Sequence, residues 1–176
     1  MASKRTRIYT HVYTSPVGDL HLAVDREGRV VRVSYLPLEF PPNRFRVEEN
    51  KYACGELEYQ LDRYFAGKLR RFSVNLWMDG TEFQMSVWRR LLKIQYGDTM
   101  TYGQVAQKIG RKEAARAVGN AVAVNPLPIL VPCHRVLPAS GHIGSYALRS
   151  LGSDDGSSVK RRLLELEGVL DYERAS

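Results

Sequence analysis

The pattern of hydrophobic residues changes its period near residue 80, and this change limits the folds open to the chain. Residues 7–35 alternate weakly between apolar and polar in three short segments, with turn-forming sequences at residues 15–18 and 25–28, which indicates β-strands. Residues 52–66 instead carry apolar side chains at helical spacing, and a glycine follows them, which predicts a helix. The first part of the chain is therefore expected to form a small antiparallel sheet with one helix.

Helical signals dominate further along the chain. Thr81 with Gln84 and Thr101 with Gln104 each form a Thr-x-x-Gln capping box ahead of an apolar run, so a helix is predicted to begin at each. A third helix is expected over about residues 113–124. The second and third helices are short and separated by a tight turn, which is the arrangement of a helix-turn-helix.

A chain of 176 residues suits one large domain or two small ones. We expect an α+β domain over residues 1–79 and a largely helical domain over residues 80–176. No apolar run approaches the roughly 18 residues of a membrane span. No apolar stretch follows the basic N-terminus either, so we expect neither a membrane anchor nor a signal peptide.

The net charge of +7 and the pI of about 9.5 favour a polyanionic partner, nucleic acid or an anionic membrane, although a merely basic protein stays equally open. Cys54 and Cys133 are the only cysteines, which excludes a disulfide scaffold and predicts an intracellular, cytoplasmic location. Cys54 is expected to be structural. The histidines show no metal-ligand spacing with the cysteines, so we expect neither a metal nor another cofactor.

The second helix of the helix-turn-helix consists largely of small residues, with Arg116 as its one large charged side chain. A helix that reads the major groove presents several long polar side chains, whereas a helix of small residues can press its backbone into the minor groove, roughly 6 Å wide. Arg116 would then reach into the base stack. An alanine-rich helix packed against the core is the alternative, and these residues alone favour it.

The segment from Asn125 to Val136 carries the clearest chemical signal. Three prolines stiffen the chain ahead of Cys133, and His134 follows it directly. A thiol attacks as a thiolate, and a free cysteine, with a pKa of about 8.5, needs a base. His134 is a candidate to take the proton, directly or through a water. A buried core cysteine beside a chance histidine is the alternative.

A third group for this pair is predicted near the C-terminus. Residues 150–158 read as flexible, and residues 159–167 carry an apolar helical stripe that Glu167 shares, while Glu165 points to solvent. A carboxylate on an apolar face needs a partner, and an imidazole would provide one. The sequence thus predicts a Cys-His-Glu relay.

These segments are similar to the O6-alkylguanine-DNA alkyltransferase family. The resemblance rests on residues 102–106, 114–119 and 125–136, the last with Pro-Cys-His-Arg-Val, and it covers residues 81–170 closely. It implies an α+β fold with a ribonuclease H-like N-terminal domain and a winged-helix-like C-terminal domain that holds the helix-turn-helix.

The resemblance also implies roles for single residues. Cys133 would accept the alkyl group, His134 would be its water-mediated base, and Glu167 would orient the histidine. Asn125 would brace the turn at the cysteine. Tyr102 would rotate the target phosphate and help to protonate the leaving guanine.

Further implied roles concern the DNA and the base pocket. Arg116 would replace the flipped base in the stack, and the helix would enter the minor groove with its small residues, Ala114, Ala115 and Gly119. Tyr146 and Gly144 would wall the pocket. The backbone of Val136 and of Cys133 would read the base's amino group, and the N–H of Ala147, where many members have serine, would donate to O6.

The function implied is irreversible, single-turnover transfer of the alkyl group from O6-alkylguanine, and from O4-alkylthymine, in double-stranded DNA to Cys133, after the nucleotide is flipped. We expect a monomer, with cooperative binding on DNA left open. The main alternative is a non-catalytic protein that only recognises alkyl lesions, although such relatives lack the cysteine. A sequence-reading transcription regulator and a cysteine hydrolase are more distant alternatives.

Overall fold

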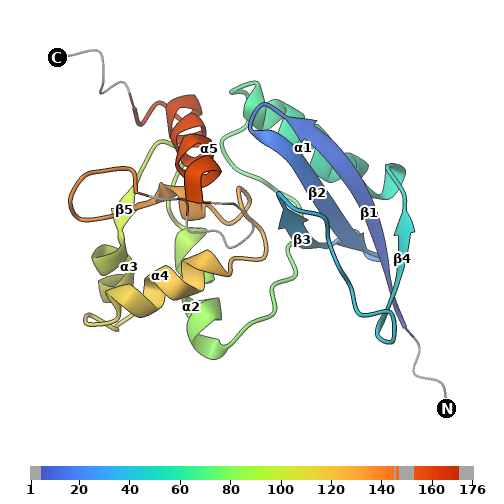
Figure 1. Ribbon diagram of the computed structural model, residues 1–176, viewed down its shortest axis with the longest axis horizontal. Helices are drawn as coiled ribbons and strands as arrows, with labels where there is room; N and C mark the ends of the chain where they lie inside the picture. Colours follow the sequence, from blue (N-terminus) through green and yellow to red (C-terminus); the bar gives the residue numbers. More distant parts are fainter. Residues whose placement is uncertain (1–4, 145, 147–152, 171–176) are drawn as a thin grey trace. The chain divides into compact units, whose positions relative to one another are not determined.

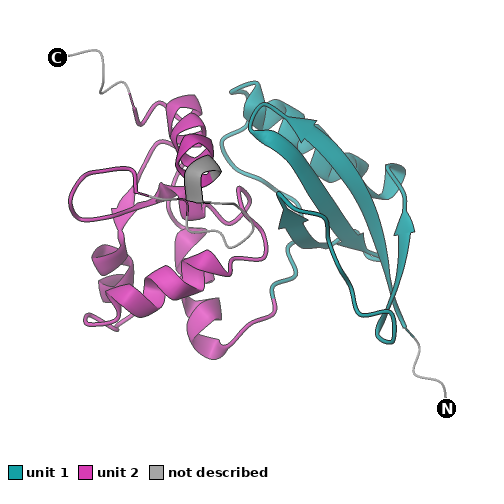
Figure 2. Ribbon diagram, in the orientation of Figure 1, with its two compact units in different colours: residues 1–78 teal, residues 79–176 magenta. Residues whose placement is uncertain are grey.

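The computed structural model describes residues 5–144, 146 and 153–170, with side chains from residue 156 onward in the last range (Figure 1). The chain divides into two compact units, residues 1–78 and residues 79–176 (Figure 2). Each unit has its own buried apolar residues. We describe the two units separately.

Unit 1 contains a four-stranded sheet. Its strands are β1 (Thr6–Ser15), β2 (Gly18–Asp25), β3 (Val30–Ser34) and β4 (Phe45–Glu49), in the order β3-β2-β1-β4. The three expected strands pair antiparallel, but β4 pairs parallel to β1. The expectation of a purely antiparallel sheet was therefore wrong. β4 is an edge strand with largely polar, half-exposed or exposed side chains, so no buried alternation marks it in the sequence.

The predicted helix of unit 1 is confirmed, with one turn of 3-10 helix, η1 (Tyr52–Cys54), ahead of α1 (Gly55–Phe65). Two bonds tie these helices to β1. The Tyr13 hydroxyl donates to Asp62 at 2.8 Å, and the fully buried Cys54 thiol lies 3.9 Å from the Tyr9 carbonyl oxygen. Burial raises the pKa of Cys54 to about 11, as expected of a structural thiol.

Unit 2 is mainly helical. Its elements are α2 (Glu82–Leu91), β5 (Met100–Thr101), α3 (Tyr102–Lys108), α4 (Ala115–Ala123), η2 (Cys133–Arg135), β6 (Val136–Leu137) and α5 (Ser153–Leu166). Both capping boxes are present, with the side chains of Thr81 and Thr101 accepting from the N–H of Gln84 and Gln104. Helices α2, α3 and α4 contact one another, and α3 and α4 form the expected helix-turn-helix.

The last helix begins earlier than predicted. α5 starts at Ser153, inside the stretch that the sequence suggested was flexible, and the rest of that stretch lies outside the described residues. Serine and aspartate are common at the starts of helices in general, so their presence in a sequence stretch does not by itself indicate flexibility. The glycine and serine content of this stretch obscured the start of the helix.

A short parallel pairing positions the site within unit 2. Met100 pairs with Val136 and Thr101 with Leu137, so β5 and β6 lie side by side. α3 follows β5 directly and η2 precedes β6 directly, so this pairing ties the start of α3 to the segment that carries Cys133. None of the helices in the described ranges has the length and hydropathy of a membrane span.

Candidate active site

A tight turn over residues 125–131 precedes Cys133. The side-chain amide of Asn125 donates to the Val131 carbonyl oxygen at 2.8 Å, and its oxygen accepts from the N–H of Leu127 at 3.0 Å. Within the turn Ile129 has a φ of 74°, a conformation that β-branched residues rarely adopt. Such a residue persists only where its surroundings fix it, so the Asn125 bonds and the flanking prolines hold a strained turn.

Cys133 is the first residue of η2 and is 1% exposed. Its Sγ accepts from the Asn125 amide at 3.0 Å and lies 3.5 Å from the Tyr146 hydroxyl, which donates to the sulfur once it is a thiolate. Burial raises the pKa of the thiol, while the bonds from Tyr146 and Asn125 and the charge of Lys160 lower it. The surroundings therefore favour the thiolate while burial opposes it, so a base is needed.

His134 and Glu167 form a buried pair, with Nε2 and Oε1 separated by 2.7 Å. Burial raises the pKa of Glu167, but His134 and Arg135 outweigh it and lower that pKa to about 2. Burial lowers the pKa of His134, so the ring is neutral at neutral pH. Since a carboxylate only accepts, Nε2 carries the proton and Nδ1 the lone pair. Nδ1 is buried and has no hydrogen-bond partner among the described residues.

Arg135 is a third member of the His134–Glu167 group, and the sequence analysis assigned it no role. Its Nε and Nη2 donate to the two oxygens of Glu167 at 2.8 and 2.9 Å, and Nη1 donates to the Ile94 carbonyl oxygen at 2.6 Å. A bidentate guanidinium fixes the plane of a carboxylate. In the sequence, only its place in the Pro-Cys-His-Arg motif indicated that Arg135 belongs to the site.

Lys160 is a second residue that the sequence analysis missed. It is 1% exposed, and its Nζ donates to the Val136 carbonyl oxygen at 2.7 Å. Burial lowers its pKa to about 8, and the charge of Cys133 acts in the opposite direction. Its position, three and four residues before the buried Leu163 and Leu164, was the available signal, because that spacing shares a helix face.

The predicted base-pocket residues are partly brought together. Tyr146 is buried beside Cys133, and Val136 is buried, with its carbonyl bonded to Lys160. Gly144 has a φ of 69°, and a Cβ there would lie 2.8 Å from a Pro138 side-chain carbon. Ala147 lies outside the described residues.

Tyr102 is the first residue of α3 and is half-buried. Burial raises its pKa, and the negative charge of Cys133 raises it further. Gly119 on α4 faces it, because a Cβ on that glycine would lie 3.9 Å from the Tyr102 ring. The phenol therefore holds its proton near the thiol.

Helix α4 has two different faces. Val118, Ala121 and Val122 are buried, which satisfies the core-packing interpretation. Arg116 is exposed, and Ala114, Ala115 and Gly119 are half-buried. The small residues thus leave the helix backbone accessible beside one free-standing arginine. The core-packing interpretation is confirmed for the buried face, and the minor-groove interpretation concerns the remaining residues and stays a prediction.

No group of His, Cys, Asp or Glu side chains suited to a metal ion occurs among the described residues. What unit 2 offers is a helix-turn-helix with a thiol, a neutral imidazole and a carboxylate held at its centre. This combination defines a DNA-binding protein with a nucleophilic cysteine.

Two family models match the chain. Residues 82–169 match 6-O-methylguanine DNA methyltransferase, DNA binding domain, and residues 8–78 match 6-O-methylguanine DNA methyltransferase, ribonuclease-like domain. The methylated-DNA–protein-cysteine methyltransferase of Methanosarcina acetivorans is 42% identical over 167 residues, 92% of this chain and 99% of its own. That of Mycobacterium leprae is 42% identical over 161 residues, 91% of this chain and 92% of its own.

Solved structures agree. Mycobacterium tuberculosis OGT in complex with DNA superposes with a TM-score of 0.75 at 39% identity over 92% of each chain. O6-methylguanine-DNA methyltransferase from Pyrococcus kodakaraensis gives a TM-score of 0.60 at 26% identity, covering 92% of this chain and 99% of that one.

The chain belongs to the methylated-DNA–protein-cysteine methyltransferase family. It is a DNA-repair enzyme that transfers a methyl group from DNA to a protein cysteine. The family resemblance and the α+β fold predicted from the sequence are thereby confirmed.

Proposed function

We propose that Cys133 takes the alkyl group irreversibly from O6 of a guanine that has been flipped out of duplex DNA. One observation carries the proposal. A buried thiol is held by Asn125 and Tyr146, next in sequence to a neutral histidine whose Nδ1 has no partner among the described residues. A buried acceptor of this kind needs a donor, and a water between Nδ1 and Sγ would supply one.

In the proposed activation the proton of Cys133 passes through that water to Nδ1 of His134. The bond from Nε2 to the Glu167 carboxylate stabilises the imidazolium that results. Arg135 keeps Glu167 ionised and in plane, so the carboxylate does not take the proton itself. The Asn125 amide and the Tyr146 hydroxyl stabilise the thiolate.

In the proposed transfer a bond forms between Sγ and the alkyl carbon as the bond from that carbon to O6 breaks. The electron pair leaves with guanine, which takes up one proton, and Tyr102 is the proposed donor because its phenol is protonated and close enough to Cys133 for the charge of the thiolate to act on it. The product is a thioether. No group in the site hydrolyses a thioether, so each molecule acts once. The same attack serves O4-alkylthymine.

For DNA binding we propose that α4 enters the minor groove on the side of Ala114, Ala115 and Gly119. Arg116 is exposed on that helix and would fill the space of the flipped base. Cys133, His134, Glu167 and Tyr102 all belong to unit 2 of one chain. A monomer would therefore be sufficient for the reaction.

The test is the mass of the intact protein and of its peptides after incubation with a duplex that contains O6-methylguanine. We expect a gain of one methylene on the Cys133 peptide, in at most one-to-one yield, and no gain in Cys133→Ala. Cys54 is an internal control, because its buried thiol has a pKa raised to about 11. Tight binding of the lesion duplex without a mass gain would instead favour the non-catalytic lesion-recognition protein.

A further inference from the structure

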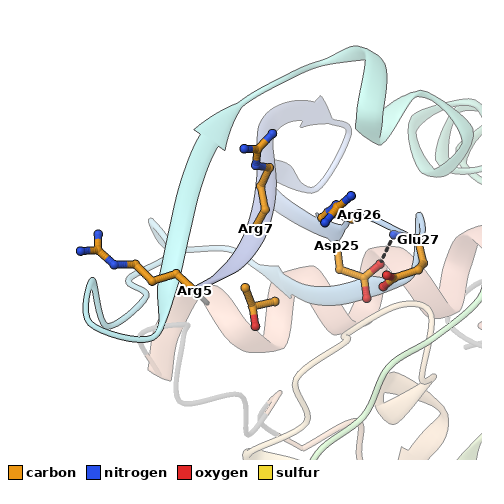
Figure 3. A pocket seen from close by; sticks show the side chains of 6 residues that line it. Arg5, Arg7, Asp25, Arg26 and Glu27 are labelled. Carbon is orange, nitrogen blue, oxygen red and sulfur yellow. Dashed lines mark hydrogen bonds between the residues drawn. The ribbon is translucent and has the colours of Figure 1, made fainter. Parts of the chain in front are cut away.

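A cluster of arginines lies at one end of the unit 1 sheet, whereas the elements that carry the proposed reaction belong to unit 2. A hollow of about 230 Å³ is lined by Arg5, Thr6, Arg7, Asp25, Arg26 and Glu27. Arg5 precedes β1, and Thr6 and Arg7 are its first residues. Asp25 is the last residue of β2, and Arg26 and Glu27 follow it in the turn (Figure 3). Strand pairing explains their proximity, since Ile8 lies opposite Asp25. We call these residues the sheet-end cluster.

The carboxylates of the sheet-end cluster already have hydrogen-bond and ion-pair partners within the protein. Asp25 is 5% exposed, and its oxygens accept from the N–H groups of Glu27 and Arg29 and from Nε of Arg29 at 2.6 Å. Glu27 accepts from Nη2 of the same arginine at 3.0 Å. Arg29 bonds both carboxylates but does not line the hollow, so it offsets one of their two negative charges from outside.

The arginines of the cluster have fewer ion-pair partners than the carboxylates. Arg7 has one long ion pair, 3.8 Å from Glu48, and that carboxylate also bonds Arg46 at 2.9 Å. Arg5 and Arg26 form no ion pair within the part of the chain that the structure describes. With Arg29 counted, four arginines stand against the two carboxylates of the cluster, so this end of the sheet carries a net positive charge.

The arrangement suits a chain of anions better than one small anion. The labelled guanidinium groups point in different directions and do not converge on one point (Figure 3). Guanidinium forks bind phosphate oxygens through paired N–H donors. A row of such groups along a sheet end fits successive phosphates of a nucleic-acid backbone, which carry one charge each.

The distribution of charge between the two units also favours a nucleic-acid contact on unit 1. Residues 1–78 hold 13 basic and nine acidic side chains, a net charge of +4, and residues 79–176 hold 13 and ten, a net charge of +3. The unit that lacks the helix-turn-helix thus carries the larger share of the positive charge. This excess favours a polyanionic partner for unit 1 as well.

We propose that the sheet-end cluster of unit 1 is a second DNA-binding surface, which contacts the phosphate backbone of duplex DNA without reading its sequence. This inference rests on duplex DNA being the substrate. It adds a contact made by Arg5, Arg7 and Arg26 to those proposed for α4. The contact adds affinity for undamaged and damaged DNA alike and leaves the chemical step unchanged.

The test uses the full-length protein and a fluorescent undamaged duplex, with binding measured by anisotropy between about 50 and about 200 mM salt. Each phosphate contact contributes about 0.9 to the slope of log K against log salt. We expect the slope to fall by up to about 2.7 in a variant with three substitutions. These are Arg5→Gln, Arg7→Gln and Arg26→Gln.

A matched control removes the same charge from the opposite end of the sheet, where Tyr13 of β1 meets Asp62 of α1. It carries the substitutions Arg63→Gln, Lys68→Gln and Arg71→Gln. An equal loss of slope in both triple variants would overturn the proposal, because net charge alone would then explain it. An unchanged slope in the cluster variant would also overturn the proposal. If the cluster variant then also differed from the wild type in sedimentation coefficient without DNA, the cluster would be assigned to contact with a second copy of the chain.

Two further measurements keep the result interpretable. Arg26→Gln alone changes an exposed turn residue, cannot unfold the sheet, and is expected to lower the slope by about 0.9. Methyl gain on Cys133 at saturating lesion duplex is expected to equal that of the wild type in every cluster variant. If the wild type itself gained no methyl group, the proposed function would fail. The salt slopes would still show whether the sheet-end cluster binds DNA.

Discussion

At the scale of the residue, the charges buried around Cys133 balance only when the thiol is ionised. Glu167 and Arg135 offset each other through their bidentate contact, and His134 is neutral. Among the described residues, Lys160 is then the buried cation without a carboxylate partner, and Cys133 is the group that can carry the balancing negative charge. Because unpaired buried charge is costly, this balance favours the thiolate.

Glu167→Gln keeps the size of the side chain and removes its charge. We expect alkyl transfer to slow by about 10- to 100-fold, because His134 loses the carboxylate that orients its ring and stabilises its protonated form. Single-turnover rates across pH measure this. His134→Gln is the companion variant, and equal rates for Glu167→Gln and the wild type would contradict the relay.

The same substitution has a consequence in acid. The pKa of Glu167 is lowered to about 2, so its contribution to stability is fully present above its ordinary value near 4.5 and is lost as the pH falls toward 2. Denaturant unfolding between these pH values is expected to show a steeper loss of stability for the wild type than for Glu167→Gln. Parallel curves would show that the pair contributes nothing.

Lys160→Met removes the buried amine and keeps most of its volume. The pKa of Lys160 is lowered to about 8, so the folded protein binds fewer protons than the unfolded chain between about 8 and its ordinary value near 10.5. The free energy of unfolding therefore rises with pH across that window in the wild type, and we expect the rise to vanish in the variant. We also expect slower alkyl transfer at neutral pH, since the thiolate loses its cation. Lys112→Met, at an exposed position, is the control for charge.

At the scale of the element, the site depends on where helices begin. α3 starts at Tyr102, immediately after the capping box of Thr101, and β5 pairs with the strand that follows Cys133. The position of the Tyr102 phenol is therefore set by one helix cap and one two-residue strand pairing. α5 approaches from another direction and supplies Lys160 within the helix and Glu167 just after its end.

Thr101→Ala and Thr81→Ala form a matched pair, because each removes a complete capping box. Both are expected to cost about 1 kcal/mol of stability. Only Thr101→Ala is expected to slow alkyl transfer, since only that cap sets the start of the helix that begins with Tyr102. Thermal unfolding and single-turnover rates measured side by side would decide, and equal rates in the two variants would contradict the role of the cap.

Gly156→Ala tests the approach of α5 to the pocket. A Cβ at residue 156 would lie 2.9 Å from the Tyr146 carbonyl oxygen and 3.3 Å from its Cβ, closer than packed atoms allow. We expect α5 and Tyr146 to move apart, which weakens the bond between the Tyr146 hydroxyl and Sγ and slows transfer. Gly55→Ala in α1 is the control, because nothing lies within 4 Å of its added Cβ. An unchanged rate for Gly156→Ala would show that Tyr146 is not held there.

At the scale of the whole molecule, a buried thiol has to meet an atom hidden inside a DNA duplex. The thiol is 1% exposed, and the alkyl carbon lies within stacked bases. The proposed reaction therefore depends on binding energy that moves the nucleotide, and we expect Arg116 on α4 and the sheet-end cluster to supply it. The net charge of +7 serves this need.

Arg116→Ala is expected to slow transfer from a lesion duplex by about 10- to 100-fold, because the space left by the flipped base loses its filler. Transfer from a free O6-alkylguanine base should be unchanged, since a free base needs no flipping. Lys112→Ala is the control, and removes one exposed charge just before the same helix. If both substrates slowed equally, Arg116 would act on the site and not on the DNA.

The sequence by itself determined the features that depend on neighbours along the chain. The helix caps at Thr81 and Thr101, the helix-turn-helix and the adjacency of Cys133 and His134 follow from residues within a few positions of one another. The burial of Glu167 and the exposure of Glu165 followed from helical period in the same way, and the structure confirms both. Local patterns of this kind fix local geometry wherever the chain later packs.

Only the tertiary structure decided which distant groups meet. The parallel edge strand β4, the fork of Arg135 on Glu167 and the bond of Lys160 to Val136 join residues 24 to 39 positions apart. No periodicity encodes such pairs, because a buried arginine or lysine is tolerated only where packing brings it a partner. The charge balance at Cys133 belongs to this class, since it arises from two chain segments, residues 133–135 and residues 160–167, that become neighbours only on folding.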